Sequence, residues 1–382
     1  MRHLYKILCF VTMALFLLVP AQHKWELFQE KELTGWFPQV DFPAFSIKDF
    51  ASCKWQEQVD GYLKANHGFR REAIRLYNQL LWTPFCQSNN EEVTVGKDRC
   101  LFETYFVNDH YGKRMYEFYS SPEEMRAKCE REVEQMVQLQ QLLDERGKKF
   151  LFWISPGKDL VYPEYLPRNN STLPAGPVRA YDVYAPLLKE YGVNHIDFCS
   201  WFKEIRDSVD YDIFPPLGTH WSNLASVYAF DSVMRYLQHI GGAPIPPISI
   251  GGHYSEPPRD PDHDLEDLLN IMYTPNRKNL YYADVSVADT TMPRPRMLVV
   301  GDSFIQVINR NFPFDQLFDW LHFWSYNKII LYDPNHDDVK QVDLAQELAE
   351  ADYVVVAFCT SQLYDLRGFI EEAIVVLSNP VP

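Results

Sequence analysis

Basic side chains are in short supply in this sequence. Of its 382 residues, 36 are Lys or Arg against 52 Asp or Glu, which gives a formal net charge of −16 at pH 7. Proteins that bind nucleic acid use clustered basic groups to neutralise phosphates, and the sequence has no basic stripe of that kind. Nucleic acid is therefore not expected as a partner.

Closely spaced cysteines are also missing. The seven cysteines include no CxxC pair, so the spacing offers no metal-ligand motif, and we expect neither a metal nor another cofactor. Six cysteines follow the N-terminal apolar segment, an even number that permits disulfides in an oxidising compartment without defining their pairing. The sequence shows no internal repeat or low-complexity tract, and its 46% of hydrophobic residues predicts a folded chain with a large core.

A long apolar run stands at the N-terminus. Arg2, His3 and Lys6 precede the run from Ile7 to Val19, which predicts that residues 1–22 are a signal peptide or an N-terminal membrane anchor. Residues 19–21 loosely fit a signal-peptidase site, whereas residues 4–21 are long enough for an uncleaved span. The rest of the chain is thus expected to be periplasmic or extracytoplasmic, either secreted or tethered to the membrane by residues 4–21.

Helix-like and strand-like segments follow in a recognisable order. Residues 23–120 are expected to form a lead-in of helices, at 54–66 and 69–81, and loops that pack on the core. From 121 to 382 the pattern alternates, with helices predicted at 123–146, 179–191, 222–239, 341–349 and from after 358 to about 377, one near 303, and strands at 149–154, 193–196, 296–300, 328–332 and 352–358. This order predicts an α/β fold of three layers, with a mostly parallel sheet and helices on both faces.

A Pro/Gly-rich insertion interrupts this domain at about 241–264. Its density of helix and strand breakers is expected to exclude regular structure. It is either a passive excursion or a lid over a site, since long loops inside compact domains are often functional.

Ser303 follows a strand in a pattern typical of a catalytic turn. The apolar segment 297–300 leads into Gly301, Asp302 and Ser303, and a helix-compatible segment comes next. In an open α/β sheet this turn lies at the ligand crevice, and its backbone N–H groups suit an oxyanion. Ser303 is either a nucleophile or a simple helix cap. We assign Gly301 and Asp302 to the oxyanion site and the turn.

His220 is the best candidate for the base that a nucleophilic serine needs. It lies in a predicted loop, just before the helix that begins near Ser222. The sequence predicts that His220 lies within about 2.6–3.2 Å of Ser303.

Four segments in order resemble a known family. Gly301-Asp302-Ser303, with residues 219–223 (Thr-His-Trp-Ser-Asn) upstream, resembles the SGNH-like acetyltransferase domains of the alginate O-acetylation proteins AlgJ and AlgX. Segments 66–70 with 95–102, and 154–158 with 162–167, fit the same resemblance, which spans about residues 60–370. It implies a circularly permuted SGNH-hydrolase-like fold, in which the histidine precedes the serine along the chain.

The resemblance also implies roles for individual residues. Ser303 would be the nucleophile, His220 the base, and the Ser303 N–H an oxyanion donor. Further candidates for the substrate site in these segments are Trp221, Asn223 and Lys158.

One position departs from the family's pattern. That pattern reads Asp-Thr-His-Trp, whereas this chain has Gly218 where the aspartate would orient the histidine. Asp212 is expected to hold His220 instead, with Asp210 or a backbone carbonyl as alternatives. Gly218→Asp is then expected to compensate in part for loss of Asp212. Without any orienting acid, the site would be a Ser-His dyad or inactive.

These residues predict an O-acetyltransferase of the cell envelope or of an exopolysaccharide. An acetyl group would pass through Ser303 to a sugar hydroxyl, so the expected partners are a polysaccharide or glycan acceptor and, by the resemblance, a membrane-bound O-acyltransferase that supplies acetyl groups. A carbohydrate acetyl esterase would use the same residues with water as the acceptor. A non-catalytic polysaccharide-binding or assembly protein is the third alternative, because Gly218 replaces the aspartate.

Overall fold

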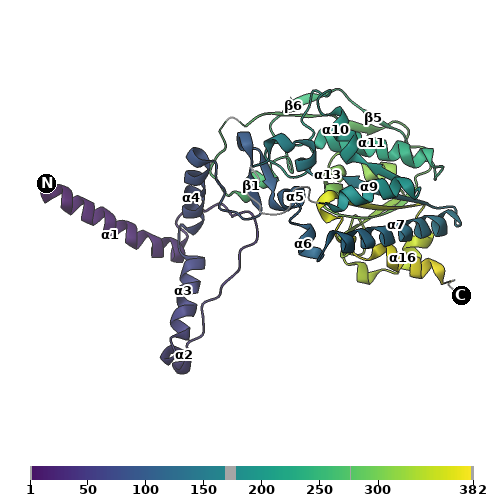
Figure 1. The fold of residues 1–382 in the computed structure, drawn as a ribbon. Helices are drawn as coiled ribbons and strands as arrows, with labels where there is room; N and C mark the ends of the chain where they lie inside the picture. Colours follow the sequence, from purple (N-terminus) through teal and green to yellow (C-terminus); the bar gives the residue numbers. More distant parts are fainter. Residues whose placement is uncertain (1, 168–177, 276, 380–382) are drawn as a thin grey trace. The chain divides into compact units, whose positions relative to one another are not determined.

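The computed structural model describes residues 2–167, 178–275 and 277–379, and it divides the chain into two compact units (Figure 1). Unit 1 comprises Met1–Glu91 and Glu266–Asn276, and unit 2 comprises Glu92–Leu265 and Arg277–Pro382. The first boundary between the two compact units thus falls after Glu91. The domain boundary that the sequence places near residue 120 stays a prediction.

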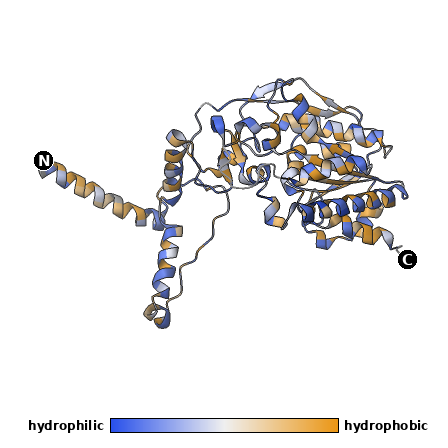
Figure 2. Cartoon of the chain, viewed as in Figure 1, coloured by the Kyte–Doolittle hydropathy of each residue, from blue (hydrophilic) through white to orange (hydrophobic). Residues whose placement is uncertain are grey.

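Unit 1 is helical. It contains α1 (Arg2–Trp25), α2 (Ile47–Ala51), α3 (Lys54–Asn66) and α4 (Arg70–Phe85). Figure 2 shows the apolar character of α1 over most of its length. The segment His3–Trp25 contains an apolar 18-residue window of which no residue is buried, with a hydropathy of 2.1, so it is long and apolar enough to cross a membrane, as a signal sequence also would be.

Unit 2 is built on a sheet in the strand order β11-β10-β9-β12-β3-β4. Its strands are β3 (Lys149–Ser155), β4 (His195–Asp197), β9 (Arg296–Gly301), β10 (Trp320–Ser325), β11 (Ile329–Leu331) and β12 (Tyr353–Cys359). All neighbours pair in parallel except β10 and β11. The carboxyl ends of the parallel strands therefore share one edge, where ligands bind in open α/β sheets.

Helices cover both faces of this sheet, as the alternating pattern predicted (Figure 1). One face packs on α7 (Pro122–Asp144), α9 (Ala180–Glu190), α15 (Leu344–Glu350) and α16 (Phe369–Ser378). The other packs on α10 (Phe198–Ile205), α11 (Asn223–His239), α13 (Phe304–Asn309) and α14 (Phe314–Leu317). In β3, Phe150 and Phe152 enter the first core while Leu151 and Trp153 enter the second, because side chains alternate along a strand.

Short elements complete the unit. They are β1 (Val93–Val95), β2 (Leu101–Glu103), α5 (Thr104–His110), α6 (Met115–Phe118), α8 (Lys158–Val161), β5 (Ile248–Ile250), β6 (Tyr254–Glu256), β7 (Leu280–Tyr282) and β8 (Val285–Val287). Helix α12 (Asp264–Leu268) begins in unit 2 and ends in unit 1.

Two expectations from the sequence were wrong. The insertion at 241–264 is not without regular structure, because β5 pairs with β8 and β6 with β7, both antiparallel; its own residues could not reveal these partners, which lie further along the chain. The strand β10 was missed, and β11 runs antiparallel to it. The cysteines of the described chain are all free thiols.

Candidate active site

Ser303 lies at the carboxyl end of β9, one residue before α13. Only glycine fits at position 301, because a Cβ there would lie 2.2 Å from the carbonyl oxygen of Ala357 on β12. The buried carboxylate of Asp302 accepts hydrogen bonds from the N–H groups of Phe304 (3.1 Å) and Cys359 (2.6 Å). Asp302 therefore ties the turn to the end of β12 and leaves Ser303 partly exposed.

His220 lies against Ser303. The Nε2 atom of His220 is 2.8 Å from Ser303 Oγ, inside the range expected from the sequence. The next residue, Trp221, is fully buried, and its indole N–H donates to the Phe304 carbonyl at 3.2 Å. This bond joins the loop that carries His220 to the helix that follows Ser303.

Asp264 holds the other side of the imidazole. Its Oδ2 atom is 2.6 Å from His220 Nδ1, and its Oδ1 atom accepts the N–H groups of Thr219 (2.7 Å) and Leu265 (2.8 Å). The carboxylate is therefore fixed on both oxygens, which keeps the proton of a neutral imidazole on Nδ1 and leaves Nε2 free to accept from Ser303.

The expectation that Asp212 holds His220 is not met. Asp212 forms an ion pair with Lys278, at 2.8 and 3.0 Å, and Asp210 lies 3.6 Å from His253. Asp264 stands in the position assigned to Asp212, although it lies 44 residues beyond His220. No local signal in the sequence pointed to Asp264, which is the last residue of the predicted insertion.

Trp221, Asn223 and Lys158 do not offer a surface to a substrate. All three are buried, with exposed fractions of 0%, 4% and 1%. The Lys158 ammonium donates to the carbonyls of Leu101 (2.7 Å) and Gly218, and burial lowers its pKa. It supports the backbone just before His220 and does not reach solvent.

Asn223 positions the segment that carries Asp264. Its backbone N–H and its side-chain amide donate to the Asp262 carboxylate at 3.2 and 2.8 Å, and Tyr282 donates to the same group at 2.7 Å. Because Asp262 is only two residues before Asp264, these bonds fix the end of the insertion beside His220.

Charges around His220 favour its protonated form. Burial lowers its pKa, but the hydrogen bond and the charge of Asp264, with the nearby carboxylates of Glu103 and Asp302, outweigh burial and raise the pKa above its ordinary value. The pKa of Asp264 is lowered, because its bonds to His220 and Thr219 outweigh its own burial. In serine enzymes, such a pair stabilises the imidazolium that forms when the serine gives up its proton.

Tyr326 is a further residue at this turn that the sequence did not indicate. Its backbone N–H donates to the Gly301 carbonyl at 2.7 Å, and the Arg367 guanidinium lies 5.8 Å from its ring centroid. Burial raises the pKa of the phenol to about 12, while the neighbouring Ser303 acts in the opposite direction. Its φ of 52° is uncommon for a large residue, and strain of this kind gathers at functional sites.

Gly218 lies in a space that admits no side chain. A Cβ at this position would be 2.9 Å from the Asp262 carbonyl oxygen and 2.9 Å from Pro215 Cγ. The sequence predicted that Gly218→Asp would compensate in part for a missing carboxylate. The structure contradicts this prediction, because any side chain at position 218 would clash with its neighbours. We expect Gly218→Asp to destabilise the protein by about 1–3 kcal/mol and to lower activity, since the displaced Asp262 segment carries Asp264.

Thermal unfolding checks this prediction. The matched control is Gly252→Asp, in the insertion that also contains Asp262, where a Cβ would meet nothing within 4 Å. Equal midpoints of thermal unfolding for Gly218→Asp and Gly252→Asp would contradict the expected destabilisation.

Among the residues that the structure describes, no group of three or more His, Cys, Asp or Glu side chains could hold a metal ion.

The fold and the site together define the class. A three-layer α/β sheet carries a serine at a strand-to-helix turn, and a carboxylate-held histidine faces that serine. This is the arrangement of the Ser-His-Asp triad that recurs in serine enzymes on unrelated folds.

The comparisons identify the family more narrowly. A family model described as an SGNH hydrolase-like domain, acetyltransferase AlgX, matches residues 93–316, more than half of the chain. The chain belongs to this AlgX family of SGNH hydrolase-like domains. No curated protein matches the chain.

The solved structures that the chain resembles have low sequence identity to it. The O-acetyltransferase domain of Pseudomonas putida AlgJ is 16% identical, with 75% of this chain and 98% of that chain covered and a TM-score of 0.46. Pseudomonas aeruginosa AlgX is 17% identical, with 76% and 68% covered and a TM-score of 0.47. Bacillus cereus PatB1 is 13% identical, with 64% and 93% covered and a TM-score of 0.42.

Proposed function

We propose that this protein is an O-acetyltransferase that moves an acetyl group through Ser303 to a hydroxyl of a polysaccharide outside the cytoplasm. The observation that carries the proposal is the linked set Ser303, His220 and Asp264, with contacts of 2.8 and 2.6 Å. Membership of the acetyltransferase AlgX family supports acetyl as the acyl group.

The geometry supports a two-step reaction. Ser303 Oγ attacks the carbonyl carbon of an acetyl ester while its proton passes to His220 Nε2, and the same proton then leaves with the departing alcohol. In the second step a sugar hydroxyl gives its proton to His220 and attacks the acetyl-serine. This attack forms the sugar ester, and the proton returns to Ser303 Oγ.

The partners follow from this chemistry. The acceptor is a polysaccharide or glycan, and the donor must present an activated acetyl ester on the outer side of the membrane. A membrane-bound O-acyltransferase is the proposed supplier. An esterase would differ only in that water takes the acetyl group from Ser303.

Tyr326 is proposed as a donor to the oxyanion of the tetrahedral intermediate, beside the Ser303 N–H. Tyr326→Phe removes the hydroxyl alone, so we expect kcat to fall about 10²–10³-fold, as when one oxyanion donor is lost, with little change in KM. Steady-state kinetics with an activated acetyl ester measure both constants. The control is Tyr211→Phe, which removes a hydroxyl from another largely buried tyrosine of unit 2, and unchanged kcat in Tyr326→Phe would exclude this role.

The acceptor decides between the alternatives. The purified protein is incubated with p-nitrophenyl acetate and short oligosaccharides, and the products are analysed by mass spectrometry with Ser303→Ala as the control. Acetylated oligosaccharide that requires Ser303 is expected. Acetate alone, over a panel of acceptors, would favour the esterase, and oligosaccharide binding without release of p-nitrophenol would favour a binding protein.

A further inference from the structure

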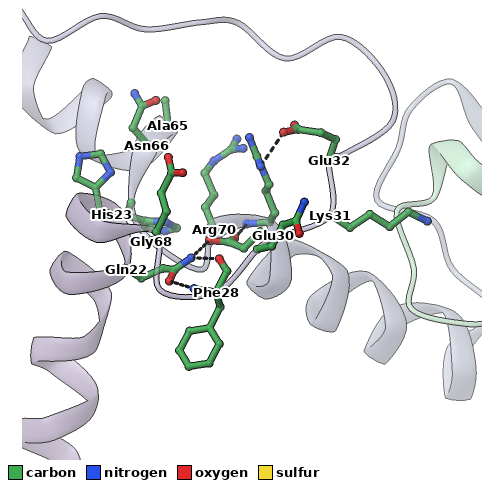
Figure 3. Close-up of a pocket in the computed structure, with 14 residues that line it drawn as sticks. Gln22, His23, Phe28, Glu30, Lys31, Glu32, Ala65, Asn66, Gly68 and Arg70 are labelled. Carbon is green, nitrogen blue, oxygen red and sulfur yellow. Dashed lines mark hydrogen bonds and ion pairs between the residues drawn. The ribbon is translucent and has the colours of Figure 1, made fainter.

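The last turns of α1 are part of the folded structure of unit 1. Gln22 is only 3% exposed. Its amide N–H donates to the Phe28 carbonyl (2.6 Å) and to Glu30 Oε1 (3.1 Å), and its oxygen accepts the Phe28 N–H (2.9 Å). Figure 3 shows this set of bonds where the chain turns back after the helix.

Gly68 provides the surface on which α1 packs. A Cβ at this position would lie 2.4 Å from the Val19 carbonyl oxygen, 2.7 Å from Gln22 Cβ and 2.7 Å from the His23 nitrogen. Such distances mean that the backbone between α3 and α4 contacts the backbone of α1 directly. No side chain larger than hydrogen fits between them.

Glu30 links the same residues to α4. One carboxylate oxygen accepts the Gln22 amide and the Phe69 N–H (2.9 Å), and the other accepts the Arg71 N–H (3.1 Å). Burial raises the pKa of Glu30, but the hydrogen bonds lower it by a larger amount, so the pKa is lowered overall. Glu30 therefore stays ionised at the start of α4. We call Gln22, Glu30 and Gly68, with the α1 backbone at 19–23, the α1 joint.

Cleavage at the signal-peptidase-like site would break this joint. A cut after Ala21 would remove Val19, which packs on Gly68, and would create a charged amino terminus at Gln22, which is buried. An unpaired charge in a buried position is strongly unfavourable. If the helix is retained, its apolar part needs an apolar environment outside the protein, because none of the apolar window is buried.

We propose that α1 is retained in the mature protein as a membrane anchor, and that the lipid bilayer is therefore a partner of unit 1. At about 1.5 Å per residue, the part of α1 before the joint, residues 2–18, is about 26 Å long, close to the thickness of the hydrocarbon core of about 30 Å. Basic residues stand at both ends, with Lys6 near the start and Lys24 near the end, and Trp25 is 63% exposed, as is typical of residues at the membrane surface.

Exposed aromatic side chains elsewhere in unit 1 support the same partner. Phe42, Phe45 and Phe50 are 59%, 63% and 49% exposed, and each has its ring centroid 5.5–6.3 Å from that of Trp55. An exposed cluster of large aromatic rings suits the headgroup region of a bilayer.

The first arm of the test is the fate of the N-terminus. The full chain with a C-terminal tag is produced in an exporting bacterial host, the membranes are washed with alkaline carbonate, and the intact mass is measured. We expect a membrane-bound protein that retains residues 2–25. A mature chain that begins at Gln22 in the soluble fraction would overturn the proposal.

The second arm tests the joint itself. Gly68→Ala places a methyl group against the α1 backbone, whereas Gly61→Ala in α3 meets nothing within 4 Å and is the matched control. In detergent, trypsin cleavage after Lys24 is expected to be about tenfold or more faster in Gly68→Ala than in the wild type, because cleavage requires local opening. Gly61→Ala should be cleaved at the rate of the wild type. Equal cleavage rates in the wild type, Gly68→Ala and Gly61→Ala would contradict the packing of α1 on Gly68.

Discussion

Alanine in place of Ser303 or of His220 is expected to lower acyl transfer by about 10⁶-fold, the loss seen when either residue of a serine enzyme's catalytic set is removed. The reason is the 2.8 Å contact between His220 Nε2 and Ser303 Oγ, since neither the nucleophile nor the base works without the other. Rates of p-nitrophenol release from an activated ester measure this effect for each variant.

The double variant separates a linked pair from two independent contributions. Residues that act as a unit are not additive, so Ser303→Ala with His220→Ala should be no slower than either single variant. A histidine outside the site provides the control. His336 is bonded to Asp333 at 2.7 Å, and His336→Ala should leave the rate unchanged; losses that multiply in the double variant would contradict the pairing.

Asp264→Asn is expected to lower kcat by about 10⁴-fold, as does loss of the orienting acid in a serine protease. In this variant the side-chain oxygen can still accept the Thr219 N–H, so the new amide N–H group would face His220 Nδ1. The imidazole proton then moves to Nε2, and His220 can no longer accept the proton of Ser303.

Asp212→Asn is the matched control, because its carboxylate is bonded to Lys278. Since isolated surface ion pairs contribute little, the variant should retain activity within about threefold. If Asp212→Asn lost most of its activity while Asp264→Asn stayed active, Asp212 would be the residue that orients His220, as the sequence predicted.

The pH profile gives a second readout of the same residue. Transfer needs neutral His220, so the rate rises as pH increases through the pKa of this histidine, which Asp264 raises above its ordinary value. In Asp264→Asn that contribution is lost and the pKa falls. The residual activity should therefore show its acid limb at lower pH than the wild type.

The sequence was informative where the chemistry is local. The turn after β9 was predicted because an apolar strand, Gly301-Asp302-Ser303 and a helix follow one another in the chain. His220 was predicted from its place just before α11. Both depend on neighbours within a few residues, which sequence patterns describe well.

Contacts between distant segments could not be predicted. Asp264 reaches His220 only because β6 pairs with β7 and because Asp262 bonds to Asn223 and Tyr282. The nearest carboxylates in sequence, Asp210 and Asp212, were therefore preferred, and they face other partners.

Burial caused the other errors. Lys158, Trp221 and Asn223 are polar or aromatic residues near the motifs. Residues that contact a substrate and buried residues that support the site both show this pattern in a sequence. Their partners, such as the Gly218 carbonyl for Lys158 and the Phe304 carbonyl for Trp221, lie in segments far away in sequence. Only the packed structure separates the two roles.

The central claim, that Ser303 carries the acetyl group, is tested most directly by peptide mass mapping after brief exposure to an activated acetyl ester. We predict a covalent acetyl group on the peptide that contains Ser303, slow to accumulate in Asp264→Asn and absent from Ser303→Ala. An acetyl group on another residue that turns over at the rate of the reaction, or turnover that persists in Ser303→Ala, would contradict the account.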